Sequence, residues 1–399
     1  MSVRKRKWKT RSGEEKEAWL VDYTDQQGDR HVRTFSRKKD ADAYAATVTV
    51  NVARGVHTAD SKSITVAEAG RRWIDSGENA GLERSTLEQY QQHLTFHILP
   101  YLGRLKLSQL SAPMIREFED KLLGGRPPPG EQAAAKRSPA MTKKVLGSLG
   151  SLLADAQERG LVAQNVVRSL RGRRRRGKER SAEMRAKGKL KVGVDIPTVG
   201  EIKTIIAHLQ SRWRPLLLTA IFAGLRASEL RGLRWSDVDL KKDEIHVRQR
   251  ADRWNKIGPP KSHSGERTIP LLPMVANALR EWKLVCPRGD LDLVFPNGRG
   301  NIESHANIVN RAFMPVQIAA GVTDKHGNAK YSGLHALRHF YASWCINRRA
   351  DGGLELPGKL VQARLGHSSI TMTLDRYGHL FPSNDSRSEL AEAERMLLA

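Results

Sequence analysis

Apolar residues recur every three or four positions along most of the chain, and short strand-like runs interrupt this helical pattern in two places. Helical spacing predicts amphipathic helices, while alternating or β-branched runs predict strands. In residues 1–60, runs at 18–23 and 31–35 flank a polar turn at 25–29, and Ser36 can cap a helix that follows. The apolar side of that helix contains Ala41, Tyr44, Ala45 and Val48. We expect a small sheet with one helix; a plain hairpin with a solvated, charged tail is the alternative.

A second region, residues 64–170, is predicted to form four amphipathic helices with short connections, which together make a small helical domain. Two of them open with capping-box sequences, in which a hydroxyl residue stands three positions before a glutamate. The first expected helix begins at the capping box Thr65–Glu68. The second begins at the capping box Ser85–Glu88 and ends at Pro100. The third covers 113–123 and the fourth covers 142–159. A loop with three consecutive prolines, 124–138, separates the last two.

The third region, residues 196–399, is predicted to be mostly helical with a small antiparallel sheet near its start. A capping box at Thr198–Glu201 opens its first helix, and a second helix from Arg214 breaks at Gly224. Strands are expected at 238–240, 244–247 and 267–271, and later helices at 274–285, 304–320, 335–347, 360–365 and 383–399. The fold class is therefore mainly α with small β-sheets (α+β) in three domains.

The formal net charge of +25 indicates a polyanionic partner, and nucleic acid is the leading candidate. A ribosomal protein or a membrane-surface protein is the alternative. Residues 168–191 hold twelve Lys or Arg against two Glu, a net of +10, and lack apolar periodicity. We interpret 171–195 as a basic linker that follows a phosphate backbone, with a nuclear localisation signal as the competing interpretation. The expected DNA contacts are Arg4, Lys5, Arg6 and Lys7 near the N-terminus, and Arg173, Arg174, Arg175 and Arg176 in the linker.

Two cysteines without metal-ligand spacing, a polar N-terminus and the lack of a long apolar run predict a soluble protein of a reducing cytosol. No disulfide framework, zinc site, metal or other cofactor is expected.

Two motifs in the first half of the third region carry candidate chemistry. Arg226 follows Gly224 at the mouth of a new helix, where a phosphate can use both a guanidinium fork and a helix N-terminus. Glu229, three residues later, is expected to orient an arginine rather than to act as a base. Lys261 lies between two predicted strands, and we expect it at a hairpin turn, where it can serve as a point charge or a proton donor.

The second half contributes a group of residues around one predicted helix. If 335–347 is helical, His335, Arg338 and His339 share one face, because residues three and four apart are neighbours. His367 follows, and Tyr377 lies ten residues further, close enough in sequence to reach the same place. A tyrosine, histidines and an arginine without a cluster of carboxylates indicate attack on a phosphodiester without a metal ion.

Taken in order, Arg226, Lys261, His335, Arg338, His367 and Tyr377 resemble the active site of the tyrosine recombinase (phage integrase) family. The matching stretches are GLRASEL, KSHSGERTIPL, HALRH, and LGH followed by the tyrosine. The resemblance extends by pattern to a helical core-binding domain at 64–170 and to the arm-binding domain of the larger integrases at 1–60. Residues 196–399 would then form the catalytic domain with a C-terminal tail helix.

The resemblance implies a role for each residue. Tyr377 would attack the scissile phosphate to give a 3′-phosphotyrosyl link, and Arg226 and Arg338 would hold the non-bridging oxygens. Lys261 would protonate the departing 5′-oxygen, and His367 would donate a hydrogen bond to the phosphate. His335 would accept the tyrosine proton. For His339 the sequence leaves two roles open, an indirect contact with the phosphate or a buried structural histidine.

The resemblance further implies a site-specific recombinase that integrates and excises a mobile element or prophage, acting as a homotetramer on double-stranded attachment sites. Core sites and arm sites would both be bound, and the need for an excisionase or a host DNA-bending protein is left open. The rivals are a type IB-like topoisomerase, which shares the phosphotyrosine chemistry, and a non-catalytic architectural DNA-binding protein.

Overall fold

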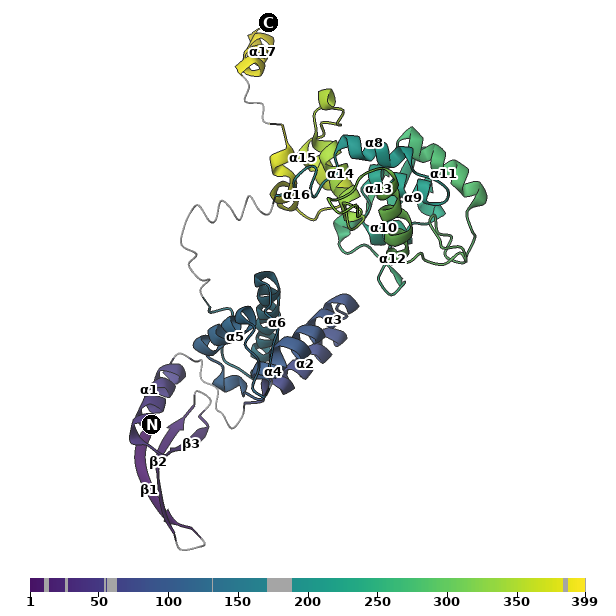
Figure 1. Cartoon of the computed structure of the whole chain (residues 1–399). Helices are drawn as coiled ribbons and strands as arrows, with labels where there is room; N and C mark the ends of the chain where they lie inside the picture. The colour runs from purple at the N-terminus through teal and green to yellow at the C-terminus, as the bar shows by residue number, and fades with distance from the viewer. Residues whose placement is uncertain are drawn as a thin grey trace. The chain divides into compact units, whose positions relative to one another are not determined.

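A computed structural model of the chain describes residues 1–10, 14–25, 28–53, 55, 63–130, 132–170, 189–382 and 387–398. The chain folds as two compact units, Met1–Arg174 and Arg175–Ala399 (Figure 1). The first holds the N-terminal sheet and a helical bundle, and the second holds the candidate chemistry. Among the described residues, no helix has both the length and the apolar character needed to cross a membrane.

The N-terminal sheet has three antiparallel strands in the order β1-β2-β3, formed by Ser2–Lys9, Glu15–Thr24 and Arg30–Phe35. Helix α1, Lys38–Ala53, packs on it through Ala41, Ala45 and Val48, so the predicted sheet, helix and apolar side are confirmed. No strand was predicted in the basic segment near the N-terminus, but it forms strand β1.

Strand β1 forms despite its run of cations because the charges stay outside and meet acidic residues of β2. The Lys5 ammonium lies 2.8 Å from the Glu17 carboxylate, and the Arg4 guanidinium lies 3.5 Å from that of Asp22. Val3 packs against the apolar core between sheet and helix. A charged edge strand of this kind resists pairing with another sheet.

The helical bundle of the first unit contains the four predicted helices with shifted ends. They are α2, Val66–Asn79; α3, Arg84–His93, continued by a π-helical turn at Leu94–Ile98 and by α4, Leu99–Leu102; α5, Ala112–Gly124; and α6, Pro139–Glu158. A short 3₁₀ turn lies at Leu107–Gln109. The predicted apolar positions are buried, with Val145, Leu149, Leu152 and Leu153 fully inaccessible.

Local hydrogen bonds explain which predicted helix starts were right. The Thr65 hydroxyl accepts the N–H of Glu68 at 3.2 Å and begins α2 as expected. The predicted start at Ser85 was wrong, because α3 begins at Arg84 and the Ser85 hydroxyl donates to the Glu83 carboxylate at 3.4 Å. Helix α6 starts three residues early, capped by Ser138.

Pro100 does not end the second helix of the bundle. The backbone widens into the π-helical turn before it, and Pro100 then occupies the first turn of α4, where its missing N–H breaks no hydrogen bond.

The second unit contains helices around a small sheet of order β4-β5-β8. Its strands are β4, Val238–Asp239; β5, Glu244–Val247; β6, Arg250–Ala251; β7, Ile257–Gly258; and β8, Arg267–Pro270, of which β6 and β7 pair separately. Its helices are α8, Val199–Ala207; α9, Trp213–Ala223; α10, Ala227–Gly232; α11, Pro273–Val285; α12, His305–Ile308; α13, Met314–Ala319; α14, His335–Ile346; α15, Gly358–Leu365; α16, Ile370–Tyr377; and α17, Arg387–Leu398. A π-helical turn, Val309–Phe313, joins α12 to α13, and short 3₁₀ turns lie at Trp235–Asp237, His263–Gly265, Arg349–Asp351 and Gly378–Leu380.

The capping box that opens the second unit is confirmed in both directions. The Thr198 hydroxyl accepts the N–H of Glu201 at 3.1 Å, and the Glu201 carboxylate accepts the N–H of Thr198 at 2.7 Å. Helix α14 is buried along most of its length and forms the centre of the unit with α9 and α15 beside it. It therefore carries its polar side chains into the interior. Helix α16, which ends in Tyr377, was not predicted.

Acid should destabilise the helical bundle through two histidines. Burial lowers the pKa of both, helped by Lys144 at His93 and by Arg137 at His97. The unfolded chain, with a histidine pKa of about 6.5, then binds more protons than the folded one, so stability falls as the pH drops through that value. Hydrogen exchange of α6 amides in the full chain, corrected for the intrinsic rate, should show weaker protection at pH 5.5 than at pH 7.5. A His93→Gln, His97→Gln variant should lose less protection; an equal loss in both proteins contradicts the assignment.

Candidate active site

Arg226 is held at the junction between α9 and α10 by a turn that requires glycine. Helix α9 ends at Gly224, whose φ is +58°, and a Cβ there would lie 2.2 Å from Tyr341 Cδ1. Any other residue would be strained and would collide with α14. The Arg226 side chain then meets Glu229, with Nη1 donating to Oε1 at 2.7 Å, and its backbone N–H donates to Oε2 at 2.9 Å. Glu229 therefore holds an arginine in place, as we expected from the sequence.

Arg338 projects from α14 and is almost fully buried, with 2 % of its surface exposed. Its Nη1 donates to the carbonyl of Gly224 at 2.6 Å, and its Nη2 donates to the carbonyl of Leu365. One guanidinium thus joins the end of α9 to the end of α15. This places Arg338 beside Arg226, as the predicted pair of arginines requires.

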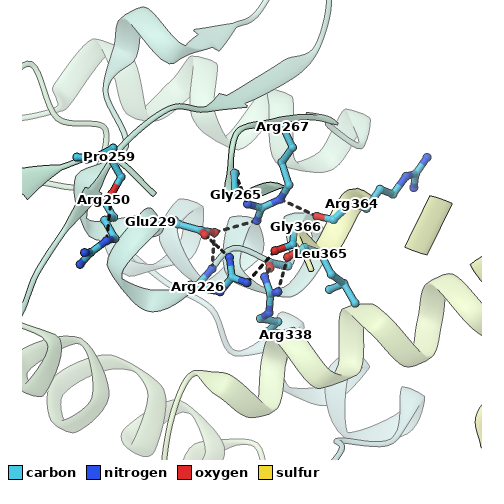
Figure 2. Close-up of polar contacts among 11 residues, drawn as sticks. Arg226, Glu229, Arg250, Pro259, Gly265, Arg267, Arg338, Arg364, Leu365 and Gly366 are labelled. Atoms are coloured by element: carbon cyan, nitrogen blue, oxygen red, sulfur yellow. Dashed lines mark hydrogen bonds and ion pairs between the residues drawn. The ribbon is translucent and has the colours of Figure 1, made fainter. Parts of the chain in front are cut away.

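A third arginine, Arg267, belongs to the same cluster and was not singled out from the sequence. It lies at the start of β8, and its Nη2 donates to Glu229 Oε2 at 2.8 Å. Its Nε donates to the carbonyl of Arg364 at 2.7 Å and its Nη1 to that of Gly265 at 2.8 Å (Figure 2). Arg267 is part of the matching stretch KSHSGERTIPL. The residues around it do not indicate, however, that its partner is the carbonyl of Arg364, 97 residues later.

Tyr377 ends α16 with its ring packed inside the protein and 1 % of its surface exposed. Its hydroxyl is hydrogen-bonded to Nδ1 of His339 at 2.6 Å. The rings of Tyr377 and His367 are parallel within 5°, with centroids 6.4 Å apart. The His367 Nδ1 is in turn hydrogen-bonded to the Thr373 hydroxyl at 2.9 Å. His339, for which the sequence left two roles open, is therefore the histidine that contacts the hydroxyl.

His335 and Lys261 are both exposed, and only His335 is in contact with another residue of the cluster. The His335 ring stands 4.5 Å from that of His339, measured between centroids, at the first turn of α14. Lys261 follows β7 in the segment leading to β8. The two predicted strands on either side of Lys261, β5 and β8, pair antiparallel as expected, but the connection that holds the lysine is long and contains the separate β6-β7 hairpin. Within the described part of the chain, no group of three or more His, Cys, Asp or Glu could hold a metal ion.

The cluster joins three guanidinium groups to the single carboxylate of Glu229, which binds Arg226 and Arg267, so it has an excess of positive charge. Burial would raise the pKa of Glu229, but Arg267 and Arg226 lower it to about 2, and the carboxylate stays ionised. Burial and the neighbouring Arg226 lower the pKa of Arg338 to about 9. A buried cation with a lowered pKa is stabilised by any anion that comes beside it.

Burial and the charge of the same arginines also change the pKa values of the residues that are candidates for proton transfer. Burial, His335 and the nearby arginines lower the pKa of His339 to about 3, and burial with Arg338 and Arg226 lowers that of His367 to about 4. Burial, then Arg338 and Arg376, lowers the pKa of His335 as well. Burial raises the pKa of Tyr377 to about 12 even though Arg338 opposes the change. At neutral pH the histidines are thus neutral and the tyrosine keeps its proton.

The expected DNA contacts fall in different parts of the chain. Arg4, Lys5, Arg6 and Lys7 lie on β1 with their side chains mostly exposed. Arg173, Arg174, Arg175 and Arg176 lie outside the described residues.

Comparisons with known proteins agree with this geometry. The profile of the phage integrase family matches residues 198–384, and that of the phage integrase N-terminal SAM-like domain matches residues 65–123. A tyrosine recombinase XerC-like protein of Caldanaerobacter subterraneus is 25 % identical over 377 residues, covering 88 % of each chain. A putative prophage phiRv2 integrase of Mycobacterium tuberculosis is 25 % identical over 398 residues, covering 95 % of this chain and 94 % of the relative.

Among solved structures, the fold is similar to that of a lambda integrase tetramer bound to a Holliday junction, with a TM-score of 0.54 and 16 % identity. The match covers 92 % of this chain and 96 % of that one. The two profiles cover both the segment with the clustered arginines and tyrosine and the preceding helical bundle. The chain belongs to the phage integrase family of tyrosine recombinases.

Proposed function

We propose that this recombinase cuts and rejoins DNA at specific sites through a 3′-phosphotyrosyl intermediate, with Tyr377 as the nucleophile. The observation that carries the proposal is one cluster in which the Tyr377 hydroxyl contacts His339 while Arg338 and Arg226 lie side by side. In this reaction the phenolic oxygen bonds to phosphorus, and the bond from phosphorus to the 5′-oxygen breaks. Because the intermediate keeps a phosphodiester, a 5′-hydroxyl can reverse the step without an energy source.

Arg226 and Arg338 would bind the non-bridging oxygens and stabilise the charge that develops on them. Their guanidinium groups are already fixed by protein acceptors, so little reorganisation is needed when the phosphate arrives. Removing one such donor typically costs about 3–4 kcal/mol of barrier. Lys261, on an exposed segment, would supply the proton for the departing 5′-oxygen. His367 would donate to the phosphate through Nε2, since Nδ1 is engaged with Thr373.

The phenolic proton would pass to the histidine pair formed by His339 and His335. His339 touches the hydroxyl, and His335 is the exposed member whose ring faces it. Burial, and after it the arginine charges, hold both histidine pKa values low. A phosphodiester bound between the arginines offsets that charge, which raises the histidine pKa values and makes proton acceptance easier.

Each part of the chain would have its own role in binding or cutting DNA. We assign 1–60 to arm-type sites, 64–170 to the core site, 171–195 to a basic linker along the phosphates, and 196–399 to catalysis. A homotetramer on paired attachment sites would integrate and excise a prophage or mobile element in the bacterial cytoplasm, at the nucleoid. An excisionase and a host bending protein are candidate accessory partners.

Incubation with nicked DNA that carries an attachment site, in EDTA, should give a covalent protein–DNA adduct that Tyr377→Phe abolishes. The reason is that the intermediate is held on the phenolic oxygen and no metal takes part. Gel electrophoresis in denaturant measures the adduct. Tyr331→Phe, which removes a buried hydroxyl that is hydrogen-bonded to Glu201 rather than to a residue of the site, is the control and should keep it.

No adduct from the intact protein, or an adduct that survives Tyr377→Phe, contradicts the proposal. Relaxation of a plasmid that lacks any site would instead favour the topoisomerase.

Removing the residues after Pro382 should impair tetramer assembly and strand exchange while cleavage of a single site persists. Helix α17 exposes Met396, Leu397 and Leu398 by 74–85 %, an apolar end that can dock on a neighbouring protomer. Assembly on DNA is measured by native gel, and recombination by product formation between two sites. Leu397→Ser with Leu398→Ser should reproduce the defect, whereas Glu394→Gln should not; full recombination by the truncated protein contradicts the docking role.

A further inference from the structure

Three consecutive carbonyl oxygens at the end of α15 each accept a hydrogen bond from a different arginine. The carbonyl of Arg364 accepts from Arg267 and that of Leu365 from Arg338. The carbonyl of Gly366 accepts from Arg226 Nη2 at 3.0 Å (Figure 2). The last carbonyls of a helix have no partner within it and carry the negative end of its dipole. They therefore attract three guanidinium groups to one place.

Arg267 differs from the other two arginines in that protein acceptors engage all its guanidinium nitrogens. Its side chain is 5 % exposed, compared with 29 % for Arg226. Its three nitrogens reach Glu229, Arg364 and Gly265, which lie on α10, α15 and the segment before β8. With a protein acceptor on each of its three nitrogens and its side chain buried, it is not placed to bind a phosphate directly. Any contribution to the reaction must come through its neighbours.

The neighbours of Arg267 are the supports of the predicted phosphate-binding arginines. Glu229 holds Arg267 on one carboxylate oxygen and Arg226 on both, so moving one guanidinium changes the position of the other. The turn at Gly366 packs directly on Arg267, since a Cβ at Gly366 would lie 2.9 Å from its Nη1. That turn carries the carbonyls that hold Arg226 and Arg338, and His367 follows it.

We propose that Arg267 is a positioning residue for DNA cleavage: it fixes Glu229 and the α15 turn so that Arg226 and Arg338 meet the scissile phosphate in the correct geometry. The inference rests on the proposed function and adds to it a residue that touches neither substrate nor nucleophile. A lysine cannot replace it, because one ammonium cannot reach three acceptors arranged around a planar fork.

The test is a double-mutant cycle on single-turnover cleavage of nicked attachment-site DNA at saturating protein. Arg267→Lys should slow cleavage on the order of a hundredfold, the usual effect of a misplaced catalytic group, while DNA affinity stays within about threefold because no phosphate contact is lost. Adding Arg267→Lys to Arg226→Lys should slow cleavage by a smaller factor than Arg267→Lys causes alone, because part of its effect passes through Arg226 and residues that act as one unit are not additive. Glu229→Gln, which keeps the shape but removes the shared charge, should behave like Arg267→Lys.

Arg280→Lys is the matched control, since Arg280 also bridges a carboxylate, Asp243, and a carbonyl, Leu240, but lies far along the surface from the site. It should cleave at the wild-type rate. Thermal unfolding of each variant gives the folded fraction to which rates are normalised.

Losses that multiply in the double variant, or an Arg267→Lys rate per folded molecule equal to wild type, overturn the positioning role. Should Arg267→Lys fail to fold, the cycle of Glu229→Gln with Arg226→Lys decides it in the same way. Failure of the proposed function is separate, because the unaltered protein would then form no adduct at all.

Discussion

The interaction on which the active site depends is the contact between three guanidinium groups and the carbonyl end of α15. Those carbonyls and Glu229 are the acceptors that keep Arg226, Arg267 and Arg338 together in the interior. Like charges at this spacing repel, and burial makes the repulsion stronger. A single ionised carboxylate and a helix terminus offset part of it. The balance leaves a positive site fixed in shape before any anion arrives.

Burial, reinforced by that positive charge, controls the protonation of the other residues. Together they keep His335, His339 and His367 neutral, and burial also keeps Tyr377 protonated. In this state proton transfer from Tyr377 to His339 is unfavourable, because the pKa values of the two groups in contact are about 12 and about 3. In the proposed reaction, a bound phosphate diester raises the pKa of the histidine that receives the proton.

Much of this was predictable from the sequence because it depends on local rules. The glycine before Arg226, the face shared by His335, Arg338 and His339, and the capping box at Thr198 depend on residues within a few positions. The buried positions of α6 followed from apolar spacing alone. Strand β1 was not predicted, because its pairing is made by backbone groups and by acidic partners on β2 that lie ten or more residues away.

The supporting contacts of the site could not be predicted for the same reason. Arg267 meets a carbonyl 97 residues later, and the role of His339 was left open because its partner, Tyr377, is 38 residues away. Helix α16 is eight residues long and partly polar, so its pattern was too short to recognise. The β6-β7 hairpin in the connection that holds Lys261 was not predicted, because its strands have only two residues each.

The most direct test of the fixed arginine cluster is ¹⁵N NMR of guanidinium groups in the DNA-free protein, with signals assigned from single Arg→Lys variants. Hydrogen bonds to carbonyls and to Glu229 slow rotation of a guanidinium and protect its protons from exchange. Arg226, Arg267 and Arg338 should therefore show separate, protected signals before DNA is added, in contrast to the exposed Arg6. Signals from Arg226 and Arg338 that are averaged like those of Arg6 until DNA binds would contradict a site formed in advance.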